Sequence, residues 1–323
     1  MPPFLSSAGG RTILSIGRAR LLPSRTRRGR PSITDVTTEH LAKLIDGRAL
    51  ADRVLATAAE KVARIKAASG LTPSLATILV GSDPASVTYT RMKRKRCLDA
   101  GMKPVRVELP AGTTTETLIA EIERLGRDPT VHGILVQHPV PKPIDKRAAF
   151  EAIPTQKDVD GVTSAMLGRM ILGMPSYPAC TPEGIMRLLA EYHVPLVGAH
   201  AVVIGRSPIL GRPMASMLIN AHATVTLCHS RTRDVPAIVA QADVLIVAVG
   251  KPRFVQGDWI KPGAVVIDAG YNEHNIGDVD FDTAAKRASL ITPVPGGVGP
   301  MTIAVLIDQT ATAAADQLSL KLD

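Results

Sequence analysis

Short apolar segments alternate with helical patterns along most of this chain, and that alternation most constrains its fold. In the first half, strand-like segments occupy residues 75–80, 105–109 and 133–137, and helical patterns occupy residues 47–69, 83–100 and 114–125. Strands that alternate with helices predict a parallel sheet with helices on both of its faces.

The second half repeats this pattern with four further apolar strands, at residues 201–204, 224–227, 244–249 and 264–267. A helix is expected before them, with Thr181 as its N-cap and Pro182 at its first position, ending near Tyr192. Residues 140–177 are rich in loop signals, and a last helix after Thr302 is expected to pack on the first half.

We therefore predict an α/β fold of two domains with a cleft between them. The expected parts are a basic, disordered extension at 1–38, a first α/β domain at 39–177 completed by a C-terminal helix at 300–320, and a Rossmann-like, doubly wound parallel-sheet domain at 178–299.

The net charge of +9 is unevenly distributed along the chain. Residues 1–34 contain seven arginines and no acidic residue, so the rest of the chain is nearly neutral. Such a segment has the composition of a mitochondrial transit peptide, or it is an unstructured extension of a cytoplasmic protein. Aromatic residues make up only 3% of the chain, which argues against a single-strand nucleic-acid binder.

No stretch of 18 apolar residues occurs, so no membrane span is expected. The cysteines Cys97, Cys180 and Cys228 are far apart and odd in number, which indicates reduced thiols and no zinc site.

A glycine-bounded turn follows the first strand of the second half. Gly205, Arg206 and Ser207 lead to Gly211, and a helix pattern starts there. A helix N-terminus after such a turn suits a pyrophosphate, although Ser207 stands where a dinucleotide fingerprint has its second glycine. An ordinary strand-to-helix turn remains an alternative.

The next strand ends in Ser230 and Arg231, with no acid before Asp234. A hydroxyl and an arginine suit a 2′-phosphate, which favours NADP over NAD. A solvated basic turn is the alternative.

Three features of the first half are candidates for chemistry. Tyr89 and Lys93 lie four residues apart on one helix face, although a basic run at 91–96 is also typical of a solvated surface. Gln137 ends a strand at the edge where α/β sheets bind ligands. Asp158 and Asp160 form a loop pair that is a metal pair, an anchor for a polar ring or a simple turn, and no third carboxylate follows at calcium-loop spacing.

A run of prolines and glycines at 293–302 stands directly before the last apolar segment. Proline fixes φ and glycine allows close backbone approach, so this loop suits the wall of a ligand pocket. A tight connector is the alternative.

Taken together, these segments resemble the bifunctional methylenetetrahydrofolate dehydrogenase/cyclohydrolase family. The similar motifs occur in family order over roughly residues 41–320, and they are the segments at 89–93, 133–141, 157–161, 180–184, 203–214 and 293–302.

The resemblance implies two reactions at one site, as steps of one-carbon metabolism. Hydride passes from 5,10-methylenetetrahydrofolate to NADP⁺, and water then opens the methenyl product to 10-formyltetrahydrofolate. It also implies a homodimer, with no metal and no nucleic-acid or membrane partner.

The resemblance further implies a role for each motif residue. Tyr89 would stack on the folate, Lys93 would move the proton and activate water, and Gln137 would orient Lys93. Asp160 would anchor the pterin. The remaining positions are assigned as a set: Pro295, Gly296 and Gly297 against the substrate, and Gly205, Arg206, Ser207, Gly211, Ser230 and Tyr271 against NADP.

Three positions depart from the family pattern: Met92, His138 and Tyr271. None removes a proposed catalytic group, but His138 could shift the pH profile and Tyr271 could alter cofactor affinity. The basic run at 91–96 could also attract a polyglutamate tail. A dehydrogenase with weak cyclohydrolase activity and a non-catalytic NADP-binding regulator with a nucleic-acid arm are the competing hypotheses. We expect a cytoplasmic enzyme, with the mitochondrial matrix as the alternative.

Overall fold

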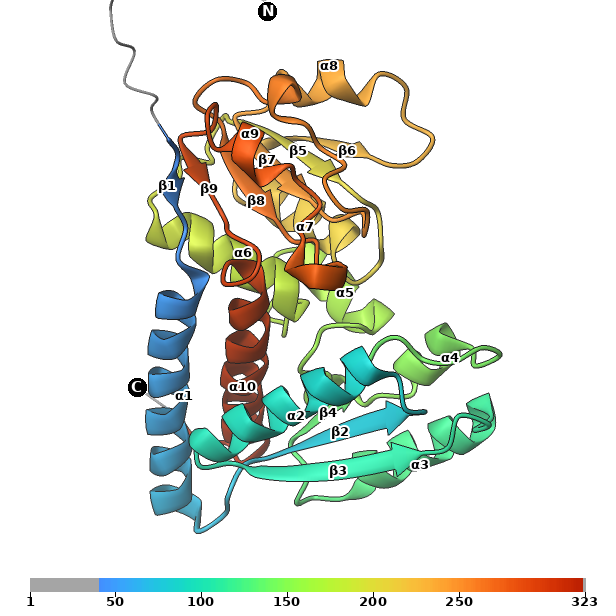
Figure 1. The fold of residues 1–323 in the computed structure, drawn as a ribbon. Helices are drawn as coiled ribbons and strands as arrows, with labels where there is room; N and C mark the ends of the chain where they lie inside the picture. Colours follow the sequence, from blue (N-terminus) through green and yellow to red (C-terminus); the bar gives the residue numbers. More distant parts are fainter. Residues whose placement is uncertain (1–40, 322–323) are drawn as a thin grey trace, which may run out of the picture. The chain divides into compact units, whose positions relative to one another are not determined.

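The computed structural model describes residues 41–321, and the arginine-rich extension lies outside them (Figure 1). These residues form two parallel sheets with helices against them. The predicted α/β class is therefore confirmed.

The smaller sheet has the strand order β3-β2-β4, with all neighbours parallel. Its strands are β2 (Ser74–Val80), β3 (Lys103–Leu109) and β4 (Gly133–Val136). The connecting helices are α2 (Pro84–Asp99) and α3 (Thr115–Arg127). β2 lies in the centre and is buried almost throughout, which explains its continuous apolar sequence.

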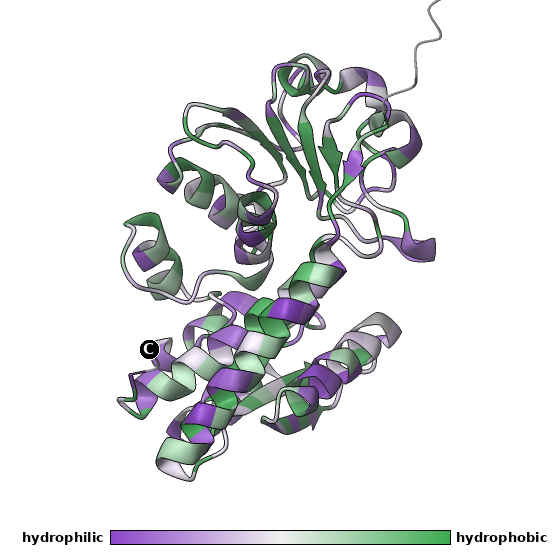
Figure 2. Cartoon of the chain, turned by 90° about the vertical axis from the view of Figure 1, so that its left-hand side faces the viewer, coloured by the Kyte–Doolittle hydropathy of each residue, from purple (hydrophilic) through white to green (hydrophobic). Residues whose placement is uncertain are grey.

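The larger sheet has six parallel strands in the order β1-β9-β8-β7-β5-β6. Its four long strands are β5 (His200–Ile204), β6 (Thr224–Cys228), β7 (Val244–Val247) and β8 (Val265–Asp268). Two short strands, β1 (Lys43–Leu44) and β9 (Leu290–Ile291), extend it on one side. Figure 2 shows the hydrophobic character of its central strands. Its shorter helices are α7 (Gly211–Asn220), α8 (Val235–Val239) and α9 (Phe281–Ala284).

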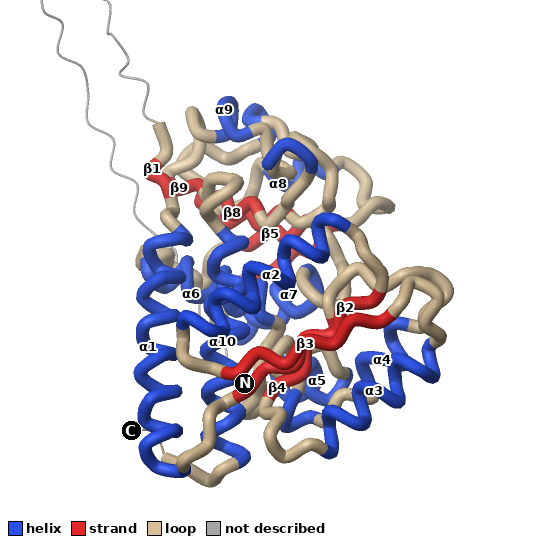
Figure 3. The backbone as a smooth tube through the Cα atoms, turned by 60° about the horizontal axis from the view of Figure 1, so that its bottom comes forward, coloured by secondary structure: helices blue, strands red, loops and turns tan. Residues whose placement is uncertain are grey.

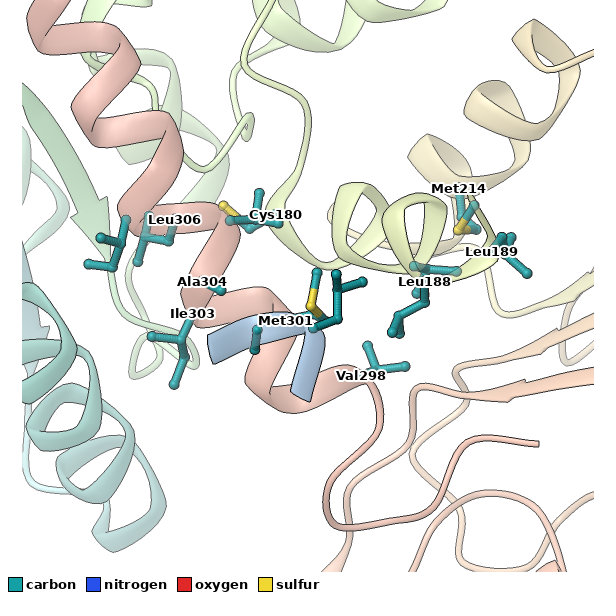
Figure 4. Packing of buried hydrophobic residues seen from close by; sticks show 14 of the residues in the cluster. Cys180, Leu188, Leu189, Met214, Val298, Met301, Ile303, Ala304 and Leu306 are labelled. Atoms are coloured by element: carbon teal, nitrogen blue, oxygen red, sulfur yellow. The ribbon is translucent and has the colours of Figure 1, made fainter. Parts of the chain in front are cut away.

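Two long helices, α1 (Gly47–Ser69) and α10 (Val298–Gln317), lie side by side (Figures 1 and 3). Asp46 caps α1 by accepting from the amides of Arg48 and Ala49 at 3.0 Å, and Gly70 ends it with φ 71°. α10 also packs on α6 (Cys180–Glu191), where Gly184 leaves room for Met301 (Figure 4). α10 thus carries a core shared by several elements, as its almost fully buried middle section shows.

The structure differs from the sequence expectations in three places. α6 begins at Cys180 without a side-chain cap, so the N-cap assigned to Thr181 is wrong, and the Thr181 hydroxyl instead bonds that of Thr302 at 3.0 Å. The loop-rich stretch holds two further helices, α4 (Lys146–Glu151) and α5 (Ser164–Ile171). β1 pairs with β9 of the larger sheet, although the predicted domain boundaries place residues 43–44 in the first domain. The domain boundaries themselves stay a prediction.

Candidate active site

The centre of the site is a buried lysine on α2. Asp83 caps this helix by accepting from the amide of Ser86 at 2.8 Å. One turn after Tyr89, Lys93 is only 8% exposed, and its Nζ donates to Oε1 of Gln137 at 2.9 Å. The structure thus joins two candidates from separate elements.

Gln137 is held in one orientation by the chain that follows it. Its Nε2 donates to the carbonyl of His138 at 2.7 Å, which leaves Oε1 to face Lys93. The Ser86 hydroxyl donates to the same carbonyl at 3.2 Å. Because an amide has one accepting end and one donating end, fixing Nε2 fixes where the lysine finds its acceptor.

The two aspartates after η1 (Thr155–Lys157) have different positions. Asp158 is fully buried and accepts from the amides of Val162 at 3.1 Å and Thr163 at 2.9 Å, as a turn residue does. Asp160 instead lines a cavity of about 290 Å³ together with Tyr89, Lys93 and Gln137. We name this the lysine cavity. It is also lined by Asp83, Ser86, His138, Cys180, Thr181 and Thr302.

Burial and mutual charge shift the proton affinities in the lysine cavity. Burial lowers the pKa of Lys93, and the nearby Asp160 carboxylate opposes this shift. Burial raises the pKa of Asp160, against the effect of Lys93. A lysine with a lowered pKa has more of the neutral amine near neutral pH, and so can accept a proton.

His138 is a neutral bystander of this charge pattern. Burial, followed by the charges of Lys93 and Lys146, lowers its pKa to about 4. Its ring meets that of Phe150 edge to face at 4.8 Å. His138 is therefore neutral near pH 7, and its effect on the pH profile stays a prediction.

A second cavity, of about 280 Å³, lies between α1, α2 and the proline–glycine loop at 293–300. We name it the loop cavity. Tyr89 lines both cavities, and its ring meets that of Tyr271 edge to face at 6.2 Å. The predicted substrate residues Pro295, Gly296 and Gly297 also line it, and Gly296 has φ 113°, which favours glycine. The loop is therefore a pocket wall as well as a connector.

The predicted cofactor residues other than Tyr271 lie near the C-terminal ends of β5 and β6, whereas Tyr271 follows β8 and lines the loop cavity. Gly205 has φ 124°, and a Cβ there would lie 2.2 Å from the carbonyl oxygen of Ala248. A Cβ on Gly211 would lie 1.9 Å from the carbonyl oxygen of Gly205. Only glycine fits both positions, so the turn brings bare backbone to the start of α7, as a pyrophosphate site requires.

The remaining cofactor candidates surround this turn. Arg206 and Ser207 are exposed, and the Ser207 hydroxyl accepts from the amide of Leu210 at 3.1 Å. The amide of Gly205 donates to the carbonyl of Cys228 at 2.9 Å, so the end of β6, with the exposed Ser230 two residues on, lies beside the turn. These groups fit a dinucleotide, because Gly205 and Gly211 leave space for its pyrophosphate next to the backbone.

Several polar residues of the lysine cavity, Ser86 and Cys180 among them, were not predicted as site residues from the sequence. Ser86 precedes Tyr89 by three residues on the same helix face, and that spacing could have identified it. Cys180 accompanies Asp160, and burial raises the pKa of its thiol. No sequence spacing links Cys180 to Lys93, because the two lie on different helices.

Over residues 41–321, no group of three or more His, Cys, Asp or Glu side chains is placed to hold a metal ion. Within the same range, no helix is both long and apolar enough to cross a membrane. All three cysteines are free and buried.

A parallel sheet with a glycine-bounded helix start, next to a cavity that holds a buried lysine, is typical of a dinucleotide-binding enzyme. Residues 45–160 match the catalytic domain of tetrahydrofolate dehydrogenase/cyclohydrolase, and residues 179–318 match its NAD(P)-binding domain. This chain belongs to that family, as the sequence motifs predicted.

Known relatives are similar to this chain over most of its length. Bifunctional protein FolD 1 of Streptomyces avermitilis is 59% identical over 280 residues, covering 87% of this chain and 98% of the relative. Bifunctional protein FolD of Teredinibacter turnerae is 56% identical over 278 residues, covering 86% and 99%.

Solved structures of enzymes with this activity in their names are similar to this chain in both sequence and fold. The FolD methylenetetrahydrofolate dehydrogenase/cyclohydrolase of Campylobacter jejuni is 44% identical with a TM-score of 0.83, covering 85% of this chain and 99% of that one. The Trypanosoma brucei enzyme, solved with NADP cofactor and inhibitor, is 40% identical with a TM-score of 0.84, covering 86% and 99%.

Proposed function

We propose that this chain oxidises 5,10-methylenetetrahydrofolate with NADP⁺ and hydrolyses the resulting methenyl compound to 10-formyltetrahydrofolate. The observation that carries the proposal is the buried pair of Lys93 and Gln137 on the lysine cavity, in a chain of this family. Bound NADP⁺ supplies the hydride acceptor. The residues of the chain supply position, charge and proton transfer.

The folate lies with its ring system between the lysine cavity and the loop cavity. Tyr89 borders both, so its ring contacts the substrate where the two cavities meet. Asp160 accepts hydrogen bonds from the pterin, because it lines the lysine cavity, whereas Asp158 is fully buried and bonded to backbone amides. Pro295, Gly296 and Gly297 bound the substrate from the opposite side.

Lys93 is the proton carrier of the hydrolytic step. Its neutral amine takes a proton from the water that attacks the cationic methenyl carbon, and Gln137 keeps Nζ at a fixed position. Positively charged methenyl substrate already attracts the nucleophile, so the chemistry needs only a base held in place.

NADP is favoured over NAD at the second site. Ser230 and Arg231 follow β6, and the first acid after that strand is Asp234, the residue directly before α8. Gly205, Arg206, Ser207 and Gly211 hold the pyrophosphate side, and Tyr271 contacts the cofactor from the loop cavity. Equal turnover with NAD⁺ and NADP⁺ would contradict this assignment.

We also propose that the protein is a cytoplasmic homodimer. Its buried, reduced cysteines fit a reducing compartment. Leu172, just after α5, is 74% exposed and Ile219 on α7 is 57% exposed, and these two helices contact one another. Exposed apolar side chains on adjoining helices are typical of a protein interface.

The test is a spectrophotometric assay that follows NADPH and methenyl absorbance in wild type and in Lys93→Met. We expect wild type to form NADPH, and the variant to lose hydrolysis by about 10²–10⁴-fold, the usual contribution of a positioned acid–base group. Lys95→Met is the matched control, since Lys95 is exposed on the same helix and pairs with Asp99.

The competing hypotheses give different results in the same assay. Methenyl accumulation in wild type would indicate a dehydrogenase without efficient cyclohydrolase activity. Absence of NADPH formation with both NADP⁺ and NAD⁺ would favour a non-catalytic NADP-binding regulator.

A further inference from the structure

A third cavity lies next to the lysine cavity along α2, and Lys93 lines both. It measures about 280 Å³ and lies between α2 and the strands β2 and β3. We name it the rear cavity. The α2 residues that line it are Val87, Thr90, Arg91, Lys93, Arg94 and Cys97. Val87, Arg91, Arg94 and Cys97 recur at steps of four, three and three residues, so they share one side of the helix. Ser86, Tyr89 and Lys93 form the neighbouring stripe that lines the lysine cavity.

The floor of the rear cavity is apolar and its rim is cationic. Leu75, Thr77 and Leu79 alternate along β2 and so share one face of the sheet. Thr77 is paired with Arg106 of the edge strand β3, which puts the arginine on that same face. No acidic side chain is among the described residues that line the cavity, whereas three arginines and Lys93 are.

The two arginines on α2 are available to a ligand. Arg106 is ion-paired with Glu108, but Arg91 and Arg94 are exposed and form no ion pair within residues 41–321. Unpaired guanidinium groups at positions i and i+3 lie close together on a helix and suit a carboxylate. A small hydrated anion is a poorer match than an aromatic carboxylate, because such an anion would leave the apolar floor uncovered.

We propose that the rear cavity is a binding site for a small aromatic carboxylate, with the ring on the β2–β3 floor and the carboxylate on Arg91 and Arg94. The rear cavity shares Lys93 with the proposed catalytic site, but the proposed ligand contacts are Arg91, Arg94 and the β2–β3 floor, so ligand binding alone tests the inference.

The test is an equilibrium titration of the NADP⁺-saturated full-length protein with 1-naphthoate, followed by the fluorescence of the ligand. We expect saturable binding that weakens at least tenfold in the double variant Arg91→Gln/Arg94→Gln, since two charge-assisted contacts are lost. Lys95→Gln, which removes an exposed cation of the same helix outside the cavity, is expected to bind within twofold of wild type.

Inorganic phosphate and uncharged naphthalene are the comparison ligands. Neither should displace 1-naphthoate at equal concentration, because one lacks the ring and the other lacks the charge. Displacement by phosphate, equal binding by the double variant, or absence of saturable binding would each overturn the proposal. NADPH formation by the same samples reports separately on the proposed function.

Discussion

The direction of the Lys93 shift makes the pH dependence of hydrolysis testable at one residue. Burial lowers the pKa of Lys93 and the Asp160 carboxylate raises it. Hydrolysis should rise with pH as the amine loses its proton, and level off above its pKa. Asp160→Asn removes the opposing charge, so the pKa falls further and the rising limb moves to lower pH. The measurement is kcat against pH at saturating methenyl substrate.

This experiment separates the electrostatic role of Asp160 from its role in binding. If Asp160→Asn removed only the pterin anchor, KM would rise and the rising part of the kcat–pH profile would stay at the same pH. A limb that moves to higher pH would contradict the charge argument.

Arg48 replaces the basic run at 91–96 as the main candidate for a polyglutamate contact. That run divides in the structure: Lys93 is buried, Arg91 and Arg94 line the rear cavity, and Arg96, which also lines the loop cavity, is paired with Asp52 at 3.5 Å. Arg48 lines the loop cavity from the first turn of α1 and is exposed.

We predict that Arg48→Gln raises KM for a pentaglutamylated substrate about two- to fivefold more than KM for the monoglutamate, the range of one exposed charge contact. Arg53→Gln is the control, because Arg53 on the same helix pairs with Glu191 away from that cavity. An equal KM for both substrates in wild type would remove the basis for this contact.

Among the elements, the start of α1 and the proline–glycine loop depend on each other. A Cβ on Gly47 would lie 1.8 Å from the carbonyl oxygen of Gly297. We predict that Gly47→Ala displaces the loop, destabilises the fold by about 1–3 kcal/mol as overpacking does, and lowers kcat/KM for the folate.

Gly168→Ala is the matched control for this close contact, since a Cβ there meets nothing within 4 Å. Urea denaturation and the dehydrogenase assay check both variants. An unchanged denaturation midpoint for Gly47→Ala would show that the loop can move away from the added Cβ without a cost in stability.

Elements with a local signal could be predicted from the sequence, and elements that depend on distant partners could not. The spacing of Tyr89 and Lys93 gave one helix face, and Gly205 and Gly211 marked the turn before α7. β1 has only two residues and is defined by its pairing with β9, so no local pattern marks it. The contact between Lys93 and Gln137 likewise depends on sheet order, which spacing alone does not supply.

At the scale of the whole molecule, α10 connects the first long helix to a helix from the middle of the chain. Asp308 bonds Lys61 of α1 at 2.6 Å and Arg187 of α6 at 2.9 Å, and it is 7% exposed. We predict that Asp308→Asn lowers the free energy of unfolding by about 2–4 kcal/mol, because Lys61 loses its carboxylate partner and Arg187 keeps only Glu183.

Asp99→Asn is the control, since the exposed pair of Asp99 with Lys95 contributes less than about 1 kcal/mol. Denaturant midpoints of both variants at neutral pH make the comparison. Equal midpoints would place the stability of this junction in apolar packing alone.

The pairing of β1 with β9 means that neither half of the molecule is a continuous stretch of chain. The six-stranded sheet takes its edge strand from residues before α1, and the helix that packs along α1 comes after the last strand of that sheet. During synthesis, β1 leaves the ribosome almost 250 residues before the strand that completes its pairing. A gene fragment that ends between the two sheets therefore encodes neither half intact, and a recombination event there would not exchange one activity for another.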